Sequence, residues 1–326
     1  MKERNQPILL YLVLPAFNEE EILEQNIQTL TEYFQELAEK KEIAGESRIL
    51  FVNDGSSDKT WDIISRGHKI YPIIQGIRLA CNEGHQIALY AGMEEAFKCG
   101  ASAVITMDAD LQQDIHAIPR FIEEYRKGAD IVSGVRSSRK TDSFFKRKTA
   151  SLYYGIMRML GCKLIPNSAD YRLLSKNALE ALMEYKERDL FIRGIVPVLG
   201  FKMAVVEFDV IKRCGGSTKF TFPKMARLAM DGVTSFTIRP IRLILLLGVL
   251  ILFVSGGVMI HILWEYFHDN TVSGWASILA SIWMLGGLTL FAIGIVGEYV
   301  GRAYMEAKKR PKYFVEEKLP EEEDEE

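Results

Sequence analysis

The sequence predicts an α/β domain built on a mostly parallel sheet, followed by a two-helix transmembrane hairpin. Two observations carry this prediction. Over the first two-thirds of the chain, short apolar runs rich in Val and Ile alternate with segments of helical periodicity. Near the C-terminus, two apolar stretches reach the length of about 20 residues that a helix needs to cross a bilayer.

The predicted strands and helices alternate in the order of βαβ units. The strands cover residues 9–14, 48–53, 73–79, 104–107 and 130–133. The helices cover residues 20–40, 59–67, 85–98 and 115–127. This alternation favours a sheet with helices on both faces. Ligands of such sheets bind beyond the carboxyl ends of the strands, so polar residues at those ends are the first candidates for a site.

Polar side chains follow four of the predicted strands. They are Asn18 and Glu19, Asp54, Asn82, and Asp108 and Asp110. The last two stand two residues apart after an apolar run, so both carboxylates can face the same way where the strand ends. With the side-chain oxygen of Gln112 they form an all-oxygen set suited to Mg²⁺ or Mn²⁺. The alternative interpretation is a pair of solvated acids in a turn.

The composition is that of a globular protein of about two domains, because the chain has 326 residues and a domain has roughly 150. Hydrophobic residues make up 48% and charged residues 25%, which excludes collagen-like and disordered chains. Six acids occupy residues 321–326, and without them the formal net charge changes from −3 to +3. The four cysteines form no CxxC pair, which argues against zinc and a disulfide framework. We expect no signal peptide, and neither a Walker A motif nor a GxGxxG fingerprint occurs.

The two apolar stretches cover residues 241–264 and 275–296. Their length favours membrane spans over buried core helices. The connection between them lacks Lys and Arg, which both outer flanks carry, so the positive-inside rule places both termini in the cytoplasm. Residues 222–236 read as an interfacial amphipathic helix or as a helix packed on the soluble domain.

This pattern divides the chain into four parts. They are a cytoplasmic domain over 1–221, the amphipathic helix over 222–238, two transmembrane helices over 239–301 and a basic, then acidic, cytoplasmic tail over 302–326. We therefore expect a multi-pass protein of the inner or plasma membrane whose N-terminal domain faces the cytoplasm.

Several motifs, taken as a set, resemble a known family. Three runs occur in order: Leu14-Pro15-Ala16-Phe17-Asn18-Glu19, Asn53-Asp54-Gly55-Ser56-Ser57-Asp58 and Asp108-Ala109-Asp110-Leu111-Gln112. In these runs the sequence resembles the family 2 glycosyltransferases of the GT-A fold. That fold has a Rossmann-like sheet. The polyprenyl-phosphate glycosyltransferases, among them bactoprenol glucosyltransferases and dolichyl-phosphate mannose synthase, are similar in the hairpin and in further runs: Asn82-Glu83-Gly84-His85-Gln86, Ser133-Gly134-Val135-Arg136 and Ser168-Ala169-Asp170-Tyr171-Arg172-Leu173. The sequence departs from the family pattern at Asn53, at residues 113–116 and at Thr218.

The resemblance implies a nucleotide pocket at the strand ends. Its members would be Pro15, Ala16, Asn18, Glu19, Asp54 and His85. Capping of the next helix is the alternative role for Asn18 and Glu19, and His85 is either a donor contact or a helix cap.

Phosphate groups need cationic partners. Arg136 and Lys219 are the preferred contacts, and the next candidates are Arg172, Arg193 and Arg213. Each of these last three could instead be a structural ion-pair partner, and Asp189 is a candidate mate for Arg193. Solvated surface charge is the alternative for the basic run that begins at Arg136.

The implied activity is transfer of a sugar from a nucleotide sugar, UDP-glucose or another UDP-hexose, to polyprenyl phosphate such as undecaprenyl phosphate. By resemblance the reaction inverts the anomeric centre, serves cell-envelope glycosylation and uses Mg²⁺ or Mn²⁺, with Asp108, Asp110 and Arg136 as catalytic residues. The alternatives are a mannose synthase that uses GDP-mannose and a non-catalytic membrane scaffold. A processive polysaccharide synthase is disfavoured because no Q-x-x-R-W sequence occurs. We expect lipid as a partner, no nucleic acid, and possible homo-oligomers.

Overall fold

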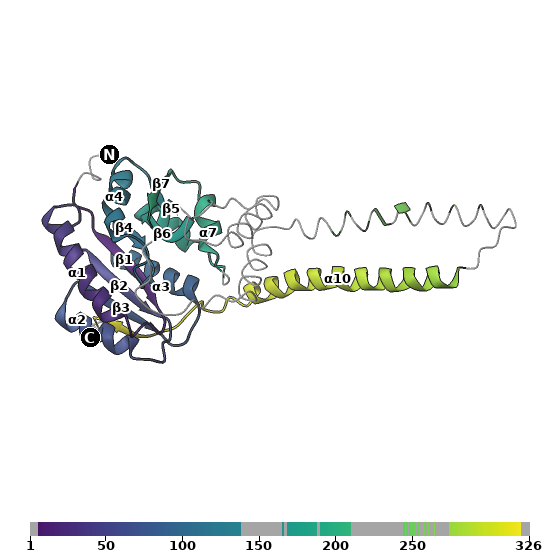
Figure 1. The fold of residues 1–326 in the computed structure, drawn as a ribbon, viewed down its shortest axis with the longest axis horizontal. Helices are drawn as coiled ribbons and strands as arrows, with labels where there is room; N and C mark the ends of the chain where they lie inside the picture. Colours follow the sequence, from purple (N-terminus) through teal and green to yellow (C-terminus); the bar gives the residue numbers. More distant parts are fainter. Residues whose placement is uncertain are drawn as a thin grey trace.

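The computed structural model describes residues 6–137, 168–187, 190–209 and 274–320, together with Ile165 and scattered positions between 244 and 264. In these residues one mixed sheet has the strand order β7-β5-β6-β4-β1-β2-β3-β8 (Figure 1). The strands are β1 (Leu10–Ala16), β2 (Arg48–Asn53), β3 (Ile74–Leu79), β4 (Ala103–Thr106), β5 (Ile131–Arg136), β6 (Ser168–Ser175), β7 (Met203–Phe208) and β8 (Val315–Leu319). The predicted α/β sheet domain is therefore confirmed, and the first five strands lie where the sequence placed them.

Helices cover both faces of the sheet, as predicted. They are α1 (Leu23–Glu39), α2 (Thr60–Ile70), α3 (His85–Lys98), the short 3-10 helix η2 (Ile115–Ala117), α4 (Ile118–Arg126), α6 (Lys176–Met183), α7 (Ile192–Ile195) and the 3-10 helix η3 (Val196–Val198). Leu12 and Leu14 of β1 point into one core layer with α1, α2 and α4, whereas Tyr11 and Val13 point into the other with α3, α6 and α7. Alternation along the strand thus builds the two layers.

The sheet is parallel from β4 through β1 and β2 to β3, and the strands β6 and β8 run antiparallel to their neighbours. β1 pairs in parallel with β2 and β4, and β2 pairs in parallel with β3. β6 runs antiparallel between β4 and β5, with Thr106 opposite Arg172. Because β6 is reversed, its first residues lie beside the carboxyl end of β4. This places Asp170 at the rim where the sequence predicted a site.

A long helix, α10 (Trp275–Ala307, 33 residues), follows the sheet domain in the chain and extends away from it (Figure 1). It begins where the second predicted span begins and ends beyond it. In the part of the chain that the structure describes, no helix combines the length and apolarity required to cross a membrane. The predicted amphipathic helix, the connection between the spans and most of the first span lie outside the described residues. The transmembrane hairpin therefore stays a prediction.

The chain after α10 returns to the sheet. Within the segment that the sequence assigned to a tail, β8 pairs antiparallel with β3 and forms the edge of the sheet (Figure 1). The indole nitrogen of Trp61 donates to Glu317 at 2.7 Å, and Arg78 forms an ion pair with Glu316 at 3.0 Å. The acidic residues 321–326 lie outside the described part.

Candidate active site

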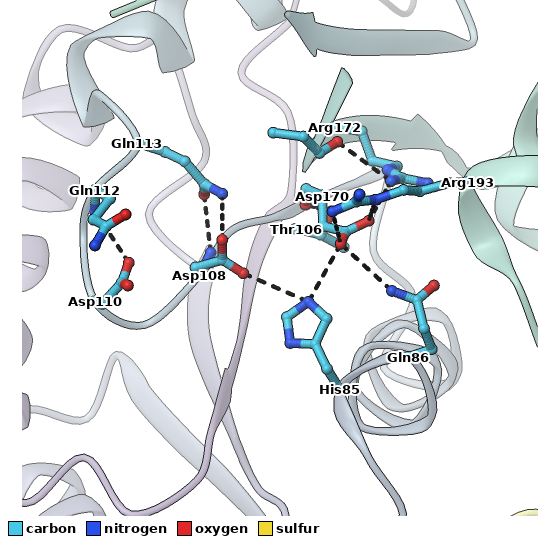
Figure 2. A network of polar contacts seen from close by, with 11 residues as sticks. His85, Gln86, Thr106, Asp108, Asp110, Gln112, Gln113, Asp170, Arg172 and Arg193 are labelled. Carbon is cyan, nitrogen blue, oxygen red and sulfur yellow. Dashed lines mark hydrogen bonds and ion pairs between the residues drawn. The ribbon is translucent and has the colours of Figure 1, made fainter. Parts of the chain in front are cut away.

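The loop after β4 carries the two carboxylates that the sequence singled out. The backbone N–H of Asp108 donates to Gln113 Oε1 at 2.9 Å, and Gln113 Nε2 donates back to Asp108 Oδ2 at 2.7 Å (Figure 2). The N–H of Gln112 donates to Asp110 Oδ1 at 3.2 Å, while Leu111 adopts a left-handed φ of 50°. The buried Gln113, noted in the sequence only as a departure from the family pattern, thus sets the orientation of Asp108.

His85, the first residue of α3, faces two carboxylates. Its Nε2 lies 3.5 Å from Asp108 Oδ1 and 3.4 Å from Asp170 Oδ2 (Figure 2). Burial alone would lower the pKa of His85, but the hydrogen bond to Asp170 and the charges of Asp108 and Asp170 raise it. Gly84, not His85, is the N-cap of α3, so the helix-cap alternative is not what the structure shows.

Asp170 is the centre of the network. Its buried carboxylate accepts hydrogen bonds from Arg172 Nη2 at 2.6 Å, from Arg193 Nε at 3.0 Å and from Arg193 Nη2 at 2.7 Å (Figure 2). Burial would raise the pKa of Asp170, but Arg193, His85 and Arg172 together hold it well below its usual range. This aspartate lies in the run from Ser168 to Leu173, and the sequence predicted no role for it. Only the reversed direction of β6 brings it to the rim beside His85.

Burial also raises the pKa of Asp108, and the carboxylates of Asp170 and Asp110 raise it further, whereas His85 and Arg193 lower it. A cation at this point would relieve that repulsion. Within the described ranges, no three His, Cys, Asp or Glu side chains converge to hold a metal ion. Mg²⁺ sites, however, often use one or two carboxylates and leave the other positions to substrate phosphates and water. Asp108 and Asp110 therefore fit a cation that is bound together with a diphosphate.

The predicted nucleotide residues lie along the same rim. Asp54 Oδ1 and Oδ2 accept hydrogen bonds from the N–H groups of Glu83 at 2.8 Å and Gly84 at 3.0 Å. Burial raises the pKa of Asp54 against these two bonds. Asp54 thus ties the end of β2 to the loop that leads into His85, and its contact with a nucleoside stays a prediction.

The loop after β1 is joined to the loop after β2. Asn18, at a left-handed φ of 53°, accepts from the N–H of Ser57 at 3.0 Å, and its own N–H donates to Ser56 Oγ at 3.0 Å. The N–H of Glu19 donates to Thr60 Oγ1 at 3.0 Å. The cap of α1 is Ile22 without a side-chain bond, so neither Asn18 nor Glu19 caps that helix. Pro15 and Ala16 end β1 and pair with Val52 and Asn53.

The predicted cationic residues divide into three groups. Arg136 ends β5 and is exposed at the rim. Arg172 is buried against Asp170 and Arg193 is paired with the same carboxylate, so the ion-pair alternative holds for both. Lys219, Arg213 and Asp189 lie outside the described residues.

Comparison with known proteins decides the family. The model of glycosyl transferase family 2 matches residues 11–214. The chain belongs to this family. The glycosyltransferase is 48% identical over 314 residues to the "Uncharacterized glycosyltransferase YkoT" of Bacillus subtilis (strain 168), covering 96% of this chain and 93% of that one.

Two further relatives have informative names. The transferase is 39% identical over 308 residues to the "Prophage bactoprenol glucosyl transferase homolog" of Escherichia coli (strain K12), covering 93% of this chain and 97% of that one. It is 39% identical over 309 residues to the "Bactoprenol glucosyl transferase" of Shigella phage SfV, with coverage of 93% and 97%. Among solved structures, glucosyl-3-phosphoglycerate synthase from Mycobacterium tuberculosis is similar with a TM-score of 0.46 and 16% identity, covering 70% of this chain and 79% of that one.

Proposed function

We propose that the transferase moves a hexose from a UDP-sugar, with UDP-glucose as the first candidate, to polyprenyl phosphate and inverts the anomeric centre. The observation that carries the proposal is the pair of carboxylates, Asp108 and Asp110, at a rim that also holds Asp54, His85 and Arg136. The names of the bactoprenol glucosyl transferase relatives support a lipid acceptor.

Charge neutralisation is the main task of the protein in this reaction. Asp108 and Asp110 would hold Mg²⁺ or Mn²⁺, which when bound supplies positive charge to the leaving diphosphate. Arg136 offers a guanidinium fork to a phosphate group. Asp54 keeps the β3–α3 loop, and with it His85, in place beside Asp108.

A general base is not required for a phosphate acceptor. The second pKa of a phosphate monoester is about 6, so the acceptor is largely dianionic near neutral pH and is already nucleophilic. General-base catalysis, typically worth ~10² to 10⁴-fold, is then unnecessary. The catalytic power comes from alignment of the acceptor with the anomeric carbon and from neutralised charge.

Membrane attachment is a second part of the proposal. The apolar stretches at 241–264 and 275–296 support it, as do large exposed side chains on α10, such as Leu290 and Phe291 at 72% and 64% exposure. Exposed apolar surface of this extent is typical of a contact with lipid or protein. Both termini and the sheet domain would face the cytoplasm, as the Lys and Arg distribution indicates.

A panel of labelled nucleotide sugars tests the function. Purified full-length protein in detergent is given undecaprenyl phosphate, a divalent cation and one labelled donor at a time. We expect a chloroform-soluble labelled product with a UDP-hexose and none when the lipid phosphate is omitted. A product formed only from GDP-mannose would show that the donor is GDP-mannose and not a UDP-hexose. If no donor gives a lipid product, the proposed acceptor is refuted.

A further inference from the structure

Asp170 is tied to four side chains that come from three elements. Arg172 lies on the same strand, β6, two residues further along and on the same face. Arg193 comes from α7 and binds through two nitrogens, while His85 and Gln86 come from the first turn of α3. The Asp170 carboxylate is therefore the one group that these side chains share in Figure 2.

These contacts also fix the backbone around the site. The hydroxyl of Thr106 donates to the carbonyl oxygen of Asp170 at 2.7 Å, which joins β6 to the last residue of β4. Gln86 donates to Asp170 at 3.4 Å and accepts from the N–H of Ile192 at 3.2 Å, which places the start of α7 against α3. The position of Arg193 relative to Asp108 thus depends on Asp170.

Two roles are open to a carboxylate at this place. As a base it would have to accept a proton, but bidentate pairing with Arg193 and the buried bond from Arg172 favour the ionised form and occupy both oxygens. The pKa held well below its usual range, with burial opposing and Arg193, His85 and Arg172 lowering it, agrees with that geometry. As an anchor it needs only to remain charged and in place.

We propose that Asp170 is a positioning residue that holds Arg193 and His85 in place at the rim that carries Asp108, and that it takes no proton in the reaction. The inference rests on the proposed function for the reaction that these side chains serve. Loss of the anchor lets Arg193 and His85 move, and a displacement of about 1 Å can lower a rate by ~10²-fold. Because Asp170 and Arg193 act through one contact, their losses are expected to be coupled.

A double-mutant cycle in the full-length protein tests this. Asp170→Asn and Arg193→Gln are each expected to lower kcat on the order of 10²-fold, and the double variant to fall no more than about threefold below the weaker single variant. Independent roles would multiply to roughly 10⁴-fold and would overturn the proposal. The matched control is Asp130→Asn. In the parent protein the Asp130 carboxylate accepts a hydrogen bond from Ser175 at the opposite end of β6, and the kcat of this variant should stay within about twofold of the parent value.

The pH profile separates an anchor from a base. Residual activity of Asp170→Asn should keep the parent profile, with its rise at the ionisation of the lipid phosphate near 6. A profile that lost this rise would identify Asp170 as the base. If Asp170→Asn fails to fold, the cycle is run with Gln86→Ala and Arg193→Gln, because Gln86 reaches the same carboxylate, and additive losses there would again contradict the proposal.

The rate at which each variant hydrolyses the labelled donor in the absence of lipid is a second readout of the same double-mutant cycle. Coupled losses in hydrolysis without any lipid product would keep the positioning role and reject the proposed acceptor. Additive losses in both reactions, with normal lipid product from the parent, would reject the positioning role alone.

Discussion

At the carboxyl end of β4, neighbouring side chains decide how the two acids lie. Gln113 fixes Asp108 by two hydrogen bonds, whereas the oxygen of Asp110 accepts one from the Gln112 N–H within its own turn. Asp110→Asn should therefore leave the fold intact and reduce transfer by at least about 10²-fold if the carboxylate holds a cation. Product formation with and without EDTA, with melting temperature as the fold control, checks this. Full activity of the parent in EDTA would refute the metal assignment.

Arg136 is the described cation best placed for a phosphate, since it is exposed at the end of β5. Arg136→Ala should lower transfer by ~10²-fold, and Arg136→Lys should restore only part of it because lysine lacks the planar fork. The parent pH profile should rise near 6 with the acceptor phosphate and show no second limb from a protein carboxylate. Initial rates from pH 5 to 8 measure both expectations. An unchanged rate in Arg136→Ala would contradict this role.

Among the elements, the loop between β2 and α2 depends on one glycine. Gly55 has a φ of +62°, and a Cβ there would lie 2.5 Å from the carbonyl carbon of Cys81 and 2.6 Å from the nitrogen of Asn82. Gly55→Ala should displace the β3–α3 loop, whose N–H groups bind Asp54. We expect the free energy of unfolding to fall by roughly 1–3 kcal/mol, which lowers the melting temperature by several degrees. Gly45→Ala is the control, because nothing lies within 4 Å of its Cβ position. Equal melting temperatures would show that the loop adapts.

The C-terminal strand is the second element with a testable role. β8 covers the edge of β3, and the chain before it is fixed by Tyr313, whose hydroxyl donates to Glu94 at 2.8 Å, and by Lys312 over the ring of Tyr90. Truncation before Lys312 should expose the β3 edge and lower the melting temperature by about 5 °C or more. Truncation before Glu321 is the control and should change it by about 1 °C at most. Thermal unfolding of both proteins in the same detergent measures the difference.

Sequence reasoning succeeded where a pattern is local. The alternation of apolar runs identified β1 to β5 and α1 to α4, and the polar residues at strand ends identified the rim. It failed where partners are distant. β8 has the polar sequence VEEKL, and its partners are distant in the chain: it pairs with β3, and its acids contact Arg78 of β3 and Trp61 of α2. Likewise, nothing near Asp170 in the chain shows that an antiparallel β6 brings it to His85.

At the scale of the whole molecule, the chain that follows the long helix connects that helix to the sheet. α10 extends from the sheet domain (Figure 1), and the chain that follows it pairs with β3, the strand that leads into the β3–α3 loop before His85. The N–H of Ala80, at the start of that loop, donates to the carbonyl oxygen of Phe314 at 3.0 Å. In the proposed function, where the long helix is attached to a membrane, this connection would hold the sheet domain near the membrane surface, where the proposed polyprenyl phosphate acceptor presents its head group.

Membrane topology is the prediction that belongs to this scale. The connection between the two apolar stretches lacks Lys and Arg, which both outer flanks carry, so both termini should be cytoplasmic and the connection external. In a background without Cys81, Cys99, Cys162 and Cys214, Asn270→Cys should react with an impermeant thiol reagent added to intact cells. Glu326→Cys should react only after the cells are opened. Labelling of Glu326→Cys in intact cells would reverse the topology, and protection of Asn270→Cys both before and after opening would show that the connection is buried rather than external.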